Sequence, residues 1–138
     1  GLPPGKARAV GLEALLETAD FVVLVLPLTE DTRGLIGPQA FARMKPGAIL
    51  INGARGPIIQ EHALLDALEG GRLRGAGLDV FDVEPLPLDS PLRGHPRILA
   101  LPHIGSATHE TRTAMAALAV DNLLSALRGE TPPAAYPL

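Results

Sequence analysis

The sequence predicts an α/β fold built on an open parallel β-sheet, and three observations lead to this prediction. Short apolar runs recur along the chain and are continuous rather than alternating, as in strands that are buried on both faces. Segments with helical spacing of leucine and alanine lie between these runs. The 15 glycines and 14 prolines indicate many short elements joined by tight turns. Strands that alternate with helices in this way form parallel sheets.

The first predicted elements are a helix, a strand and a second helix. Leucine spacing predicts a short helix at about 11–18. The run 21–26, Phe-Val-Val-Leu-Val-Leu, is apolar and β-branched and predicts a buried strand that Pro27 ends. Pro38 and the apolar face that follows it predict the start of a second short helix.

Two further strands and one helix follow. The run 48–52 predicts the second strand. Residues 60–69 predict a helix, because three leucines share its inner face and two glycines follow it as a C-terminal stop. Residues 75–80, Gly-Ala-Gly-Leu-Asp-Val, predict the third strand. The stretch 85–96 contains four prolines and is expected to be irregular.

The last strand is predicted at 98–101, and a long helix follows it. Thr108 can cap this helix through its hydroxyl, and Gly129 is expected to end it. The proline-rich tail 131–138 is expected to be extended. One face of the helix carries an apolar stripe of Ala116, Val120, Leu123 and Leu127.

Composition narrows the function classes. The net charge of −3 gives no basic surface for nucleic acid or for an anionic membrane. The chain contains no cysteine, which excludes disulfides, a thiol nucleophile and cysteine-ligated metal. No apolar run approaches the roughly 20 residues of a membrane span, and no histidine pair has metal-ligand spacing. We therefore expect a cytoplasmic protein that binds a small molecule, with no metal site.

Three residues with chemically capable side chains follow successive strands. Arg55 comes after the strand 48–52, Glu84 after the third strand, and His103 after the fourth. Because ligands bind at the carboxyl ends of parallel strands, we expect these three side chains to converge at one edge of the sheet.

The three side chains together suit one reaction type. An arginine binds a carboxylate through two hydrogen bonds, and a histidine exchanges a proton near neutral pH. A nearby glutamate would stabilise the imidazolium. This set suits the interconversion of a 2-oxo acid and a 2-hydroxy acid, with the hydride supplied by a cofactor.

Each candidate also has a plainer interpretation. Arg55 can be a surface residue, Glu84 a solvated residue before a proline, and His103 a structural histidine. Asp79 is an acid in an apolar strand, so it either makes a structural hydrogen bond or contacts a ligand at the strand end. The remaining histidines are interpreted as surface residues, namely His62, His95 and His109.

The glycines at 75–77 are not a dinucleotide-binding fingerprint. A strand rather than a helix is predicted there, and the third glycine is absent. No other glycine-rich phosphate loop occurs in the sequence. Residue chemistry alone therefore predicts half of a nucleotide-binding fold.

Several stretches of sequence carry a family resemblance in their order and spacing. They are residues 19–23, 26–36, 44–56, 63–68, 75–85 and 101–106. Together they resemble the D-isomer-specific 2-hydroxyacid dehydrogenases, in the C-terminal half of the nucleotide-binding domain, over about residues 12–128. Three stretches, residues 85–91, 100–112 and 119–123, resemble the bacterial glyoxylate/hydroxypyruvate reductases that also reduce 2-keto-D-gluconate.

The resemblance implies a role for each candidate residue. Arg55 would bind the substrate, His103 would be the general acid/base, and Glu84 would pair with that histidine. Asp79 would lie near the nicotinamide carboxamide. The cofactor-binding positions implied by the resemblance are Leu26, Pro27, Thr32, Ala54, Arg55, Asp79, His103 and Gly105.

The resemblance also implies an architecture and partners. The fold would be a Rossmann-like parallel sheet that lacks the first βαβ unit and carries a long C-terminal helix. Residues 1–105 would form the C-terminal half of the NAD(P)-binding domain, and 106–138 the helix and tail that return to the substrate-binding domain. The cofactor would be NADP or NAD, with NADPH slightly favoured, and the protein would be a homodimer.

Two function hypotheses remain open at this point. The first is a fragment of an NAD(P)-dependent oxidoreductase that acts on a small 2-oxo or D-2-hydroxy acid. The second is a non-catalytic nucleotide-binding or interaction module, because the glycine fingerprint and the substrate domain are absent from these residues. The isolated 138-residue chain is expected to be inactive.

Overall fold

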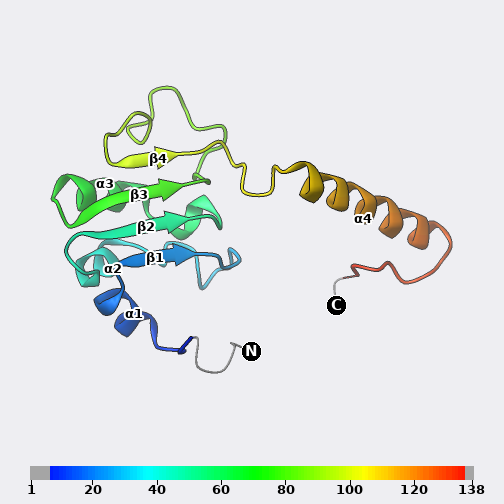
Figure 1. Ribbon diagram of the computed structural model, residues 1–138, viewed down its shortest axis with the longest axis horizontal. Coiled ribbons are helices and arrows are strands. Elements are labelled where there is room, and N and C mark those ends of the chain that lie inside the picture. The colour runs from blue at the N-terminus through cyan, green and yellow to red at the C-terminus, as the bar shows by residue number, and fades with distance from the viewer. Residues whose placement is uncertain (1–6, 136–138) are drawn as a thin grey trace. The chain divides into compact units, whose positions relative to one another are not determined.

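The computed structural model describes residues 7–135. The chain divides into two compact units, Gly1–His103 and Ile104–Leu138. In the described residues the first unit contains a β-sheet with short helices, and the second contains one long helix (Figure 1). All of the candidate residues lie in the first unit except Gly105.

The first unit is built on a parallel sheet with strand order β1-β2-β3-β4. Every neighbouring pair of strands is parallel. The predicted α/β fold with a parallel sheet is therefore confirmed. The strands are β1 (Phe21–Leu24), β2 (Ala48–Asn52), β3 (Leu73–Leu78) and β4 (Ile98–Ala100).

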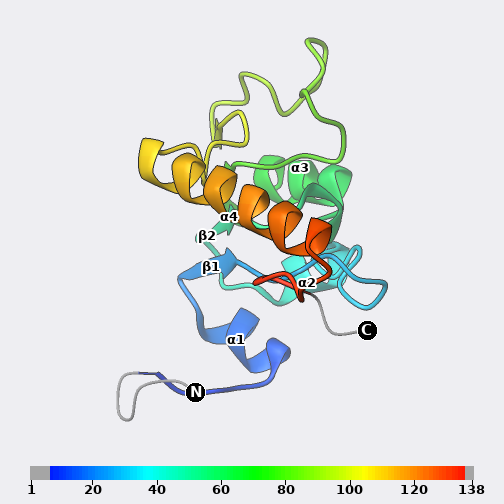
Figure 2. The same ribbon diagram turned by 90° about the vertical axis from the view of Figure 1, so that its right-hand side faces the viewer.

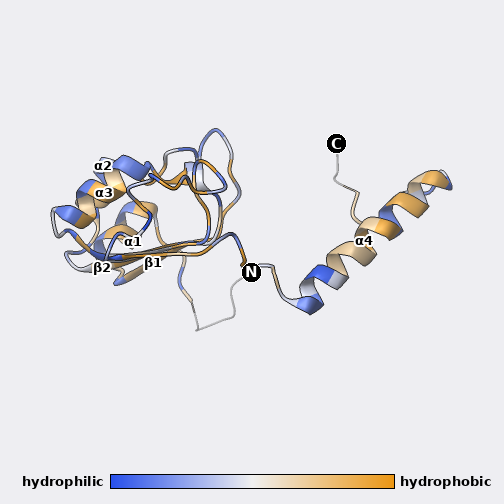
Figure 3. Ribbon diagram, turned by 90° about the horizontal axis from the view of Figure 1, so that it is seen from above, coloured by the Kyte–Doolittle hydropathy of each residue, from blue (hydrophilic) through white to orange (hydrophobic). Residues whose placement is uncertain are grey.

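The helices of this unit cover one face of the sheet, as Figure 3 shows from above. They are α1 (Leu12–Thr18), α2 (Pro38–Arg43) and α3 (Glu61–Glu69). The apolar core lies between them and the sheet, where Phe41, Leu50 and Leu64 are buried. Burial of such side chains is the main favourable contribution to folding.

The opposite face of the sheet is apolar and exposed, so the expectation of strands buried on both faces is wrong for this chain. Phe21 is 59% exposed and Leu99 is 65% exposed. Along β1 the burial alternates between exposed and buried residues. The physical reason is that α1, α2 and α3 all pack on the same face.

Three strand ends differ from the predicted ones. β1 stops at Leu24 rather than at residue 26, β3 covers Leu73–Leu78 rather than 75–80, and β4 stops at Ala100 rather than at 101. Pairing explains these ends, because Leu24 pairs with Asn52, Asn52 with Leu78, and Leu78 with Ala100. The four strands therefore finish level, and the N–H of the next residue after β2, β3 and β4 donates to the last residue of the neighbouring strand.

A short 3-10 helix, η1 (Gly56–Ile58), follows β2 and was not predicted. Gly56 begins it in close contact with the turn after β3. A Cβ atom added at Gly56 would lie 2.0 Å from the carbonyl carbon of Phe81. Position 56 therefore needs a glycine so that these two backbone segments can approach.

The second unit contains α4 (His109–Leu127). The backbone N–H of Thr111 donates to the Thr108 hydroxyl, which confirms the predicted N-cap. Gly129 follows the helix with φ of +72°, which confirms the predicted stop. Within this unit no residue of α4 is buried, so the apolar stripe is exposed.

The tail after α4 turns back, so its predicted extended conformation is wrong over the described part. The backbone N–H of Ala135 donates to the carbonyl of Pro132, and that of Ala134 donates to the Asn122 side chain. Residues 136–138 of the predicted tail lie outside the described residues. In the part of the chain that the structure describes, no helix is long and apolar enough to cross a membrane.

Substitution of Gly56 tests the close backbone contact. We expect Gly56→Ala to lower the free energy of unfolding by about 2 kcal/mol or more, because the added methyl group overlaps the Phe81 carbonyl. Urea unfolding followed by circular dichroism measures this change. The matched control is Gly53→Ala, where an added Cβ meets no atom within 4 Å and little change is expected. Equal effects of the two substitutions would contradict the contact.

Candidate active site

The level strand ends bring three loops to one edge of the sheet. Figure 2 views the first unit from the side of this edge. Arg55 lies three residues beyond Asn52 at the end of β2, and His103 lies three residues beyond Ala100 at the end of β4. Glu84 lies six residues beyond Leu78 at the end of β3, so the rule that ligand-binding loops follow the carboxyl ends of parallel strands applies to all three residues.

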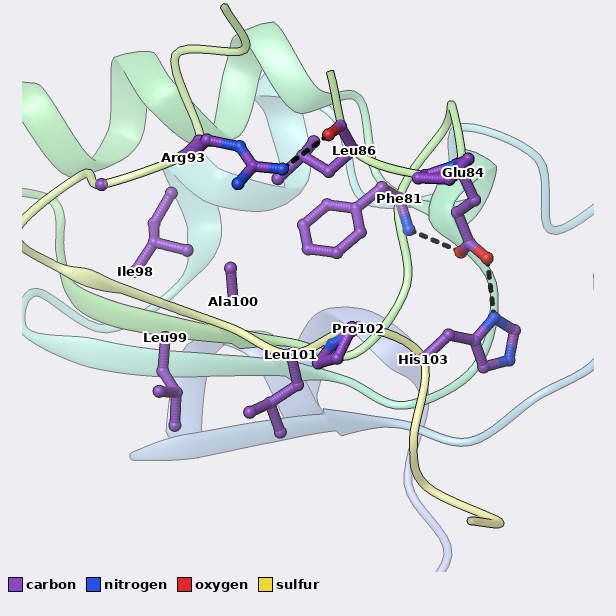
Figure 4. Close-up of a pocket in the computed structure, with 12 residues that line it drawn as sticks. Phe81, Glu84, Leu86, Arg93, Ile98, Leu99, Ala100, Leu101, Pro102 and His103 are labelled. Carbon is purple, nitrogen blue, oxygen red and sulfur yellow. Dashed lines mark hydrogen bonds and ion pairs between the residues drawn. The ribbon is translucent and has the colours of Figure 1, made fainter. Parts of the chain in front are cut away.

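The structure brings Glu84 and His103 into direct contact. The Nδ1 atom of His103 lies 2.7 Å from Oε2 of Glu84 (Figure 4). The other carboxylate oxygen, Oε1, accepts a hydrogen bond from the backbone N–H of Phe81 at 3.0 Å. Both oxygens of the carboxylate are therefore held, and the carboxylate in turn fixes one nitrogen of the imidazole.

These contacts keep Glu84 ionised. The hydrogen bond with His103 is the largest cause that lowers the pKa of Glu84 below its ordinary value of 4.5, and the Phe81 N–H acts in the same direction. The positive charge of Arg55 lowers this pKa further. Arg55 therefore contributes to the electrostatics of the Glu84–His103 pair.

The backbone at His103 adopts an uncommon conformation. Its φ is +53°, in the left-handed region that non-glycine residues seldom occupy. Such a conformation costs on the order of 1 kcal/mol or more and persists where surrounding contacts hold it. Here the bond to Glu84 is one such contact.

A pocket of about 800 Å³ lies beside the pair, between β4 and the loop 81–94. Figure 4 shows the Phe81 ring above Ala100, with Ile98 to one side and the Glu84–His103 pair to the other. The walls are mainly apolar. This pocket lies on the Glu84 side of the imidazole.

A second pocket, of about 490 Å³, lies over the ends of β1 and β2. Four of the predicted cofactor-binding residues line it together, namely Leu26, Pro27, Ala54 and Arg55. Thr32 shapes the adjoining loop, because its hydroxyl donates to the Pro27 carbonyl at 2.8 Å and accepts from the Thr29 N–H at 2.8 Å. The pocket is thus formed by two loops that follow neighbouring strands.

A family model described as "D-isomer specific 2-hydroxyacid dehydrogenase, NAD binding domain" matches residues 4–105. The chain belongs to this family. The resemblance expected from the sequence is therefore confirmed.

The chain has similar relatives and similar solved structures. It is 60% identical over 124 residues to "Glyoxylate/hydroxypyruvate reductase B" of Escherichia fergusonii, and the match covers 90% of this chain and 38% of that protein. A crystal structure of a protein from Thermus thermophilus matches 96% of this chain and 42% of that one, with a TM-score of 0.89 and 47% identity.

A third match has a bound nucleotide in its own crystal. It is a D-isomer specific 2-hydroxyacid dehydrogenase from Xanthobacter autotrophicus Py2, in complex with NADPH and MES. The TM-score is 0.75 at 43% identity, and the match covers 88% of this chain and 50% of that one. The present chain spans about two fifths of the length of the curated relatives that it matches.

The pocket over β1 and β2 fits part of the cofactor that the family name implies. The apolar part of its lining, which includes Val25, Leu26 and Pro27, suits the face of a flat ring, and the rest of the lining, which includes Arg55, is polar. The sequence contains no glycine-rich loop for the pyrophosphate.

Two other predicted positions, Asp79 and Gly105, do not line this pocket. Asp79 is half-buried and lies just after β3 rather than inside it, and its backbone N–H donates to the Asn52 carbonyl at 3.0 Å. The interpretation of Asp79 as an acid within a strand is therefore wrong. Gly105 belongs to the second unit, Ile104–Leu138.

Sequence reasoning missed the residues that hold the loops at this edge of the sheet. Asn52 is buried at the end of β2, and its side chain bonds the loop that carries Arg55. Glu61, at the start of α3, accepts a hydrogen bond from the Asp82 N–H at 2.9 Å, and burial raises the pKa of Glu61. The sequence signal that could have identified Asn52 was a polar residue at the end of an apolar strand. Among the described residues no cluster could hold a metal ion.

The lowered pKa of Glu84 predicts a pH dependence of stability. Since the folded-state pKa lies below 4.5, the contribution of Glu84 is fully present above pH 4.5 and is lost as the pH falls through the folded value. We expect wild type to exceed Glu84→Gln in stability above pH 4.5, with the difference shrinking at lower pH. Unfolding curves between pH 3 and pH 7 measure it.

The control for this measurement is the same substitution in a His103→Ala background. Removal of the imidazole takes away the largest cause of the shift, so the pH dependence of the difference should weaken. An unchanged pH dependence in that background would contradict the assignment.

Proposed function

We propose that this chain provides the proton-transfer and carboxylate-binding residues of an NAD(P)-dependent reductase. The reaction would interconvert a small 2-oxo acid and its D-2-hydroxy acid, with glyoxylate, hydroxypyruvate or 2-keto-D-gluconate as substrate. The observation that carries this proposal is the 2.7 Å contact between Glu84 and His103 at the carboxyl edge of the sheet, where Arg55 also lies. The name of the Escherichia fergusonii relative supports the substrate class.

The hydride that adds to C2 of the substrate is the chemistry that NADPH or NADH supplies when bound. His103 supplies the proton. Because Nδ1 faces the Glu84 carboxylate, Nε2 is the nitrogen that can donate to the carbonyl oxygen of the substrate. Glu84 stabilises the positive imidazolium before transfer and keeps the ring oriented. In the oxidative direction the same nitrogen accepts the hydroxyl proton.

Arg55 binds the substrate carboxylate in this proposal. Its guanidinium is a planar donor that matches a carboxylate, and its charge also polarises the adjacent carbonyl group. Its Nη1 atom now donates to the Ala54 carbonyl at 2.6 Å, and the residue is exposed at the edge of the pocket over β1 and β2. Substrate binding would replace that internal bond.

The remaining parts of the proposal concern cofactor contacts and assembly. Leu26, Pro27, Thr32 and Ala54 would form the nicotinamide and ribose side of the cofactor site, with Asp79 and Gly105 as further contacts. Residues 1–105 would belong to the NAD(P)-binding domain, and 106–138 to the return toward a substrate domain. A homodimer in the cytoplasm completes the proposal. Light scattering of the purified protein measures the oligomeric state.

Substitution of His103 tests the proton-transfer role. In the protein as its gene encodes it, we expect His103→Ala to lower kcat by about 100- to 10,000-fold, the usual contribution of a positioned general acid. Steady-state oxidation of NADPH with glyoxylate measures this change. The exposed His62 provides the control, because His62→Ala should leave kcat within about twofold. Near-normal turnover of His103→Ala would overturn the assignment.

Substitution of Arg55 tests the binding role. Arg55→Lys keeps the positive charge but loses the planar pair of donors, so we expect KM for the 2-oxo acid to rise about 10-fold or more. The KM for the nucleotide should change less. A rise confined to the nucleotide KM would contradict the role of Arg55 in carboxylate binding.

A titration with nucleotide separates this function from a module that binds no cofactor. Calorimetry of the 138-residue chain with NADH and with NADPH measures binding directly. Heat that saturates, and that Ala54→Trp abolishes by filling the pocket over β1 and β2, is the expected result. No binding by the chain would show that these residues are not a sufficient cofactor module by themselves.

A further inference from the structure

Asn52 differs from the other buried residues of the described chain. It is 1% exposed and is the polar side chain found in a core that is otherwise built from apolar ones. A buried amide costs free energy unless hydrogen bonds replace its contacts with water. An aliphatic side chain at the end of β2 would avoid that cost, so the bonds made by this amide show what it does.

Both polar atoms of the Asn52 side chain bond the loop that carries Arg55. Oδ1 accepts from the backbone N–H of Ala54 at 3.0 Å, and Nδ2 donates to the backbone carbonyl of Arg55 at 3.0 Å. The first bond is the pattern by which asparagine closes a turn two residues along the chain. The second extends the closure by one residue, so that the peptide before Ala54 and the peptide after Arg55 are both restrained.

Backbone hydrogen bonds also hold the loop on either side of this corner, because the Gly53 N–H donates to the Leu24 carbonyl at 3.2 Å and the Ile58 N–H donates to the Arg55 carbonyl at 3.3 Å. Gly53 is exposed, and nothing lies within 4 Å of the position a Cβ would take there. A glycine lacks the steric restriction that a side chain imposes on the backbone, so the bond from the Ala54 N–H to Asn52 restrains the peptide that follows Gly53. The Asn52 backbone carbonyl also accepts from the Asp79 N–H at 3.0 Å, which ties this corner to the end of β3.

We propose that Asn52 is a positioning residue for the reaction. Its side-chain amide fixes the path of the backbone between the end of β2 and Arg55, and so fixes where the Arg55 side chain begins. The inference rests on the proposed function, in which Arg55 binds the substrate carboxylate. Asn52 itself touches neither substrate nor nucleotide in this assignment. It acts through the backbone on both sides of Arg55.

Two substitutions of Asn52 separate the effect of its hydrogen bonds from the effect of its side-chain volume. Asn52→Leu has similar size and makes neither hydrogen bond. Asn52→Ser keeps a hydroxyl that can accept from the Ala54 N–H but is too short to reach the Arg55 carbonyl. In the gene-encoded protein we expect KM for glyoxylate to rise about 10-fold in Asn52→Leu and about threefold in Asn52→Ser, with kcat changed less.

A measurement that does not depend on turnover tests whether the Asn52 side chain protects the Ala54 amide. Hydrogen exchange of the Ala54 amide, measured by NMR on the 138-residue chain, should accelerate about 10-fold or more in Asn52→Leu relative to the core amide of Leu50. Unchanged protection at Ala54 would overturn the proposal, because the amide would then not depend on this side chain.

A double-mutant cycle decides whether Asn52 acts through Arg55. Once Arg55→Ala has removed the guanidinium, Asn52→Leu should change KM by less than about twofold further, although it changes KM about 10-fold in the wild-type background. If KM of the double mutant instead rises by the product of the two single-mutant effects, the positioning role is overturned. The matched control is Leu68→Ala, which removes a buried side chain from α3 and should lower stability without changing KM.

The outcomes separate this inference from the function on which it rests. If Arg55→Ala leaves KM unchanged, the carboxylate-binding role of Arg55 falls, and the positioning role falls with it. If Arg55→Ala raises KM strongly while Asn52→Leu does not, the positioning role alone is overturned. Non-additive effects together with faster exchange at Ala54 support both.

Discussion

Hydrogen-bonded pairing in the parallel sheet brings the carboxyl ends of all four strands to one level, and the candidate site depends on this pairing. Leu24, Asn52, Leu78 and Ala100 are successive partners across the sheet. The chain therefore leaves the sheet repeatedly along a single line, and residues distant in sequence become neighbours. An arginine, a glutamate and a histidine need only short loops to reach one another from such a line, so little chain entropy opposes their arrangement.

The sequence predicted the parallel sheet and the edge at which Arg55, Glu84 and His103 lie, because both follow from local patterns. Continuous apolar runs mark strands, and a residue just after a run must lie at the strand end. The ends of β1 and β3 were displaced by two residues because a strand stops where its neighbour stops, which the strand itself does not encode. The sequence did not predict the exposure of Phe21 for a similar reason, since that exposure depends on which face of the sheet the helices pack against.

Within the site, residue type predicted the candidate chemical groups but not the contacts that hold them. The bond from the Phe81 N–H to Glu84 joins backbone to side chain across a turn whose geometry no local pattern specified. The bond from Glu61 to the Asp82 N–H joins residues 21 positions apart. Asn52 was visible only as the polar end of an apolar run. Such supporting residues become apparent only when the loops are seen together.

The close approach of Gly56 to Phe81 puts the loop that carries Arg55 in direct backbone contact with the turn that carries Glu84. The loop that carries Arg55 runs directly into Gly56, and the turn that begins at Phe81 carries Glu84. With no side chain between the two backbones, neither segment can shift far without displacing the other. A shift of the Arg55 loop toward Phe81 would therefore press directly on the turn that holds the carboxylate beside the imidazole.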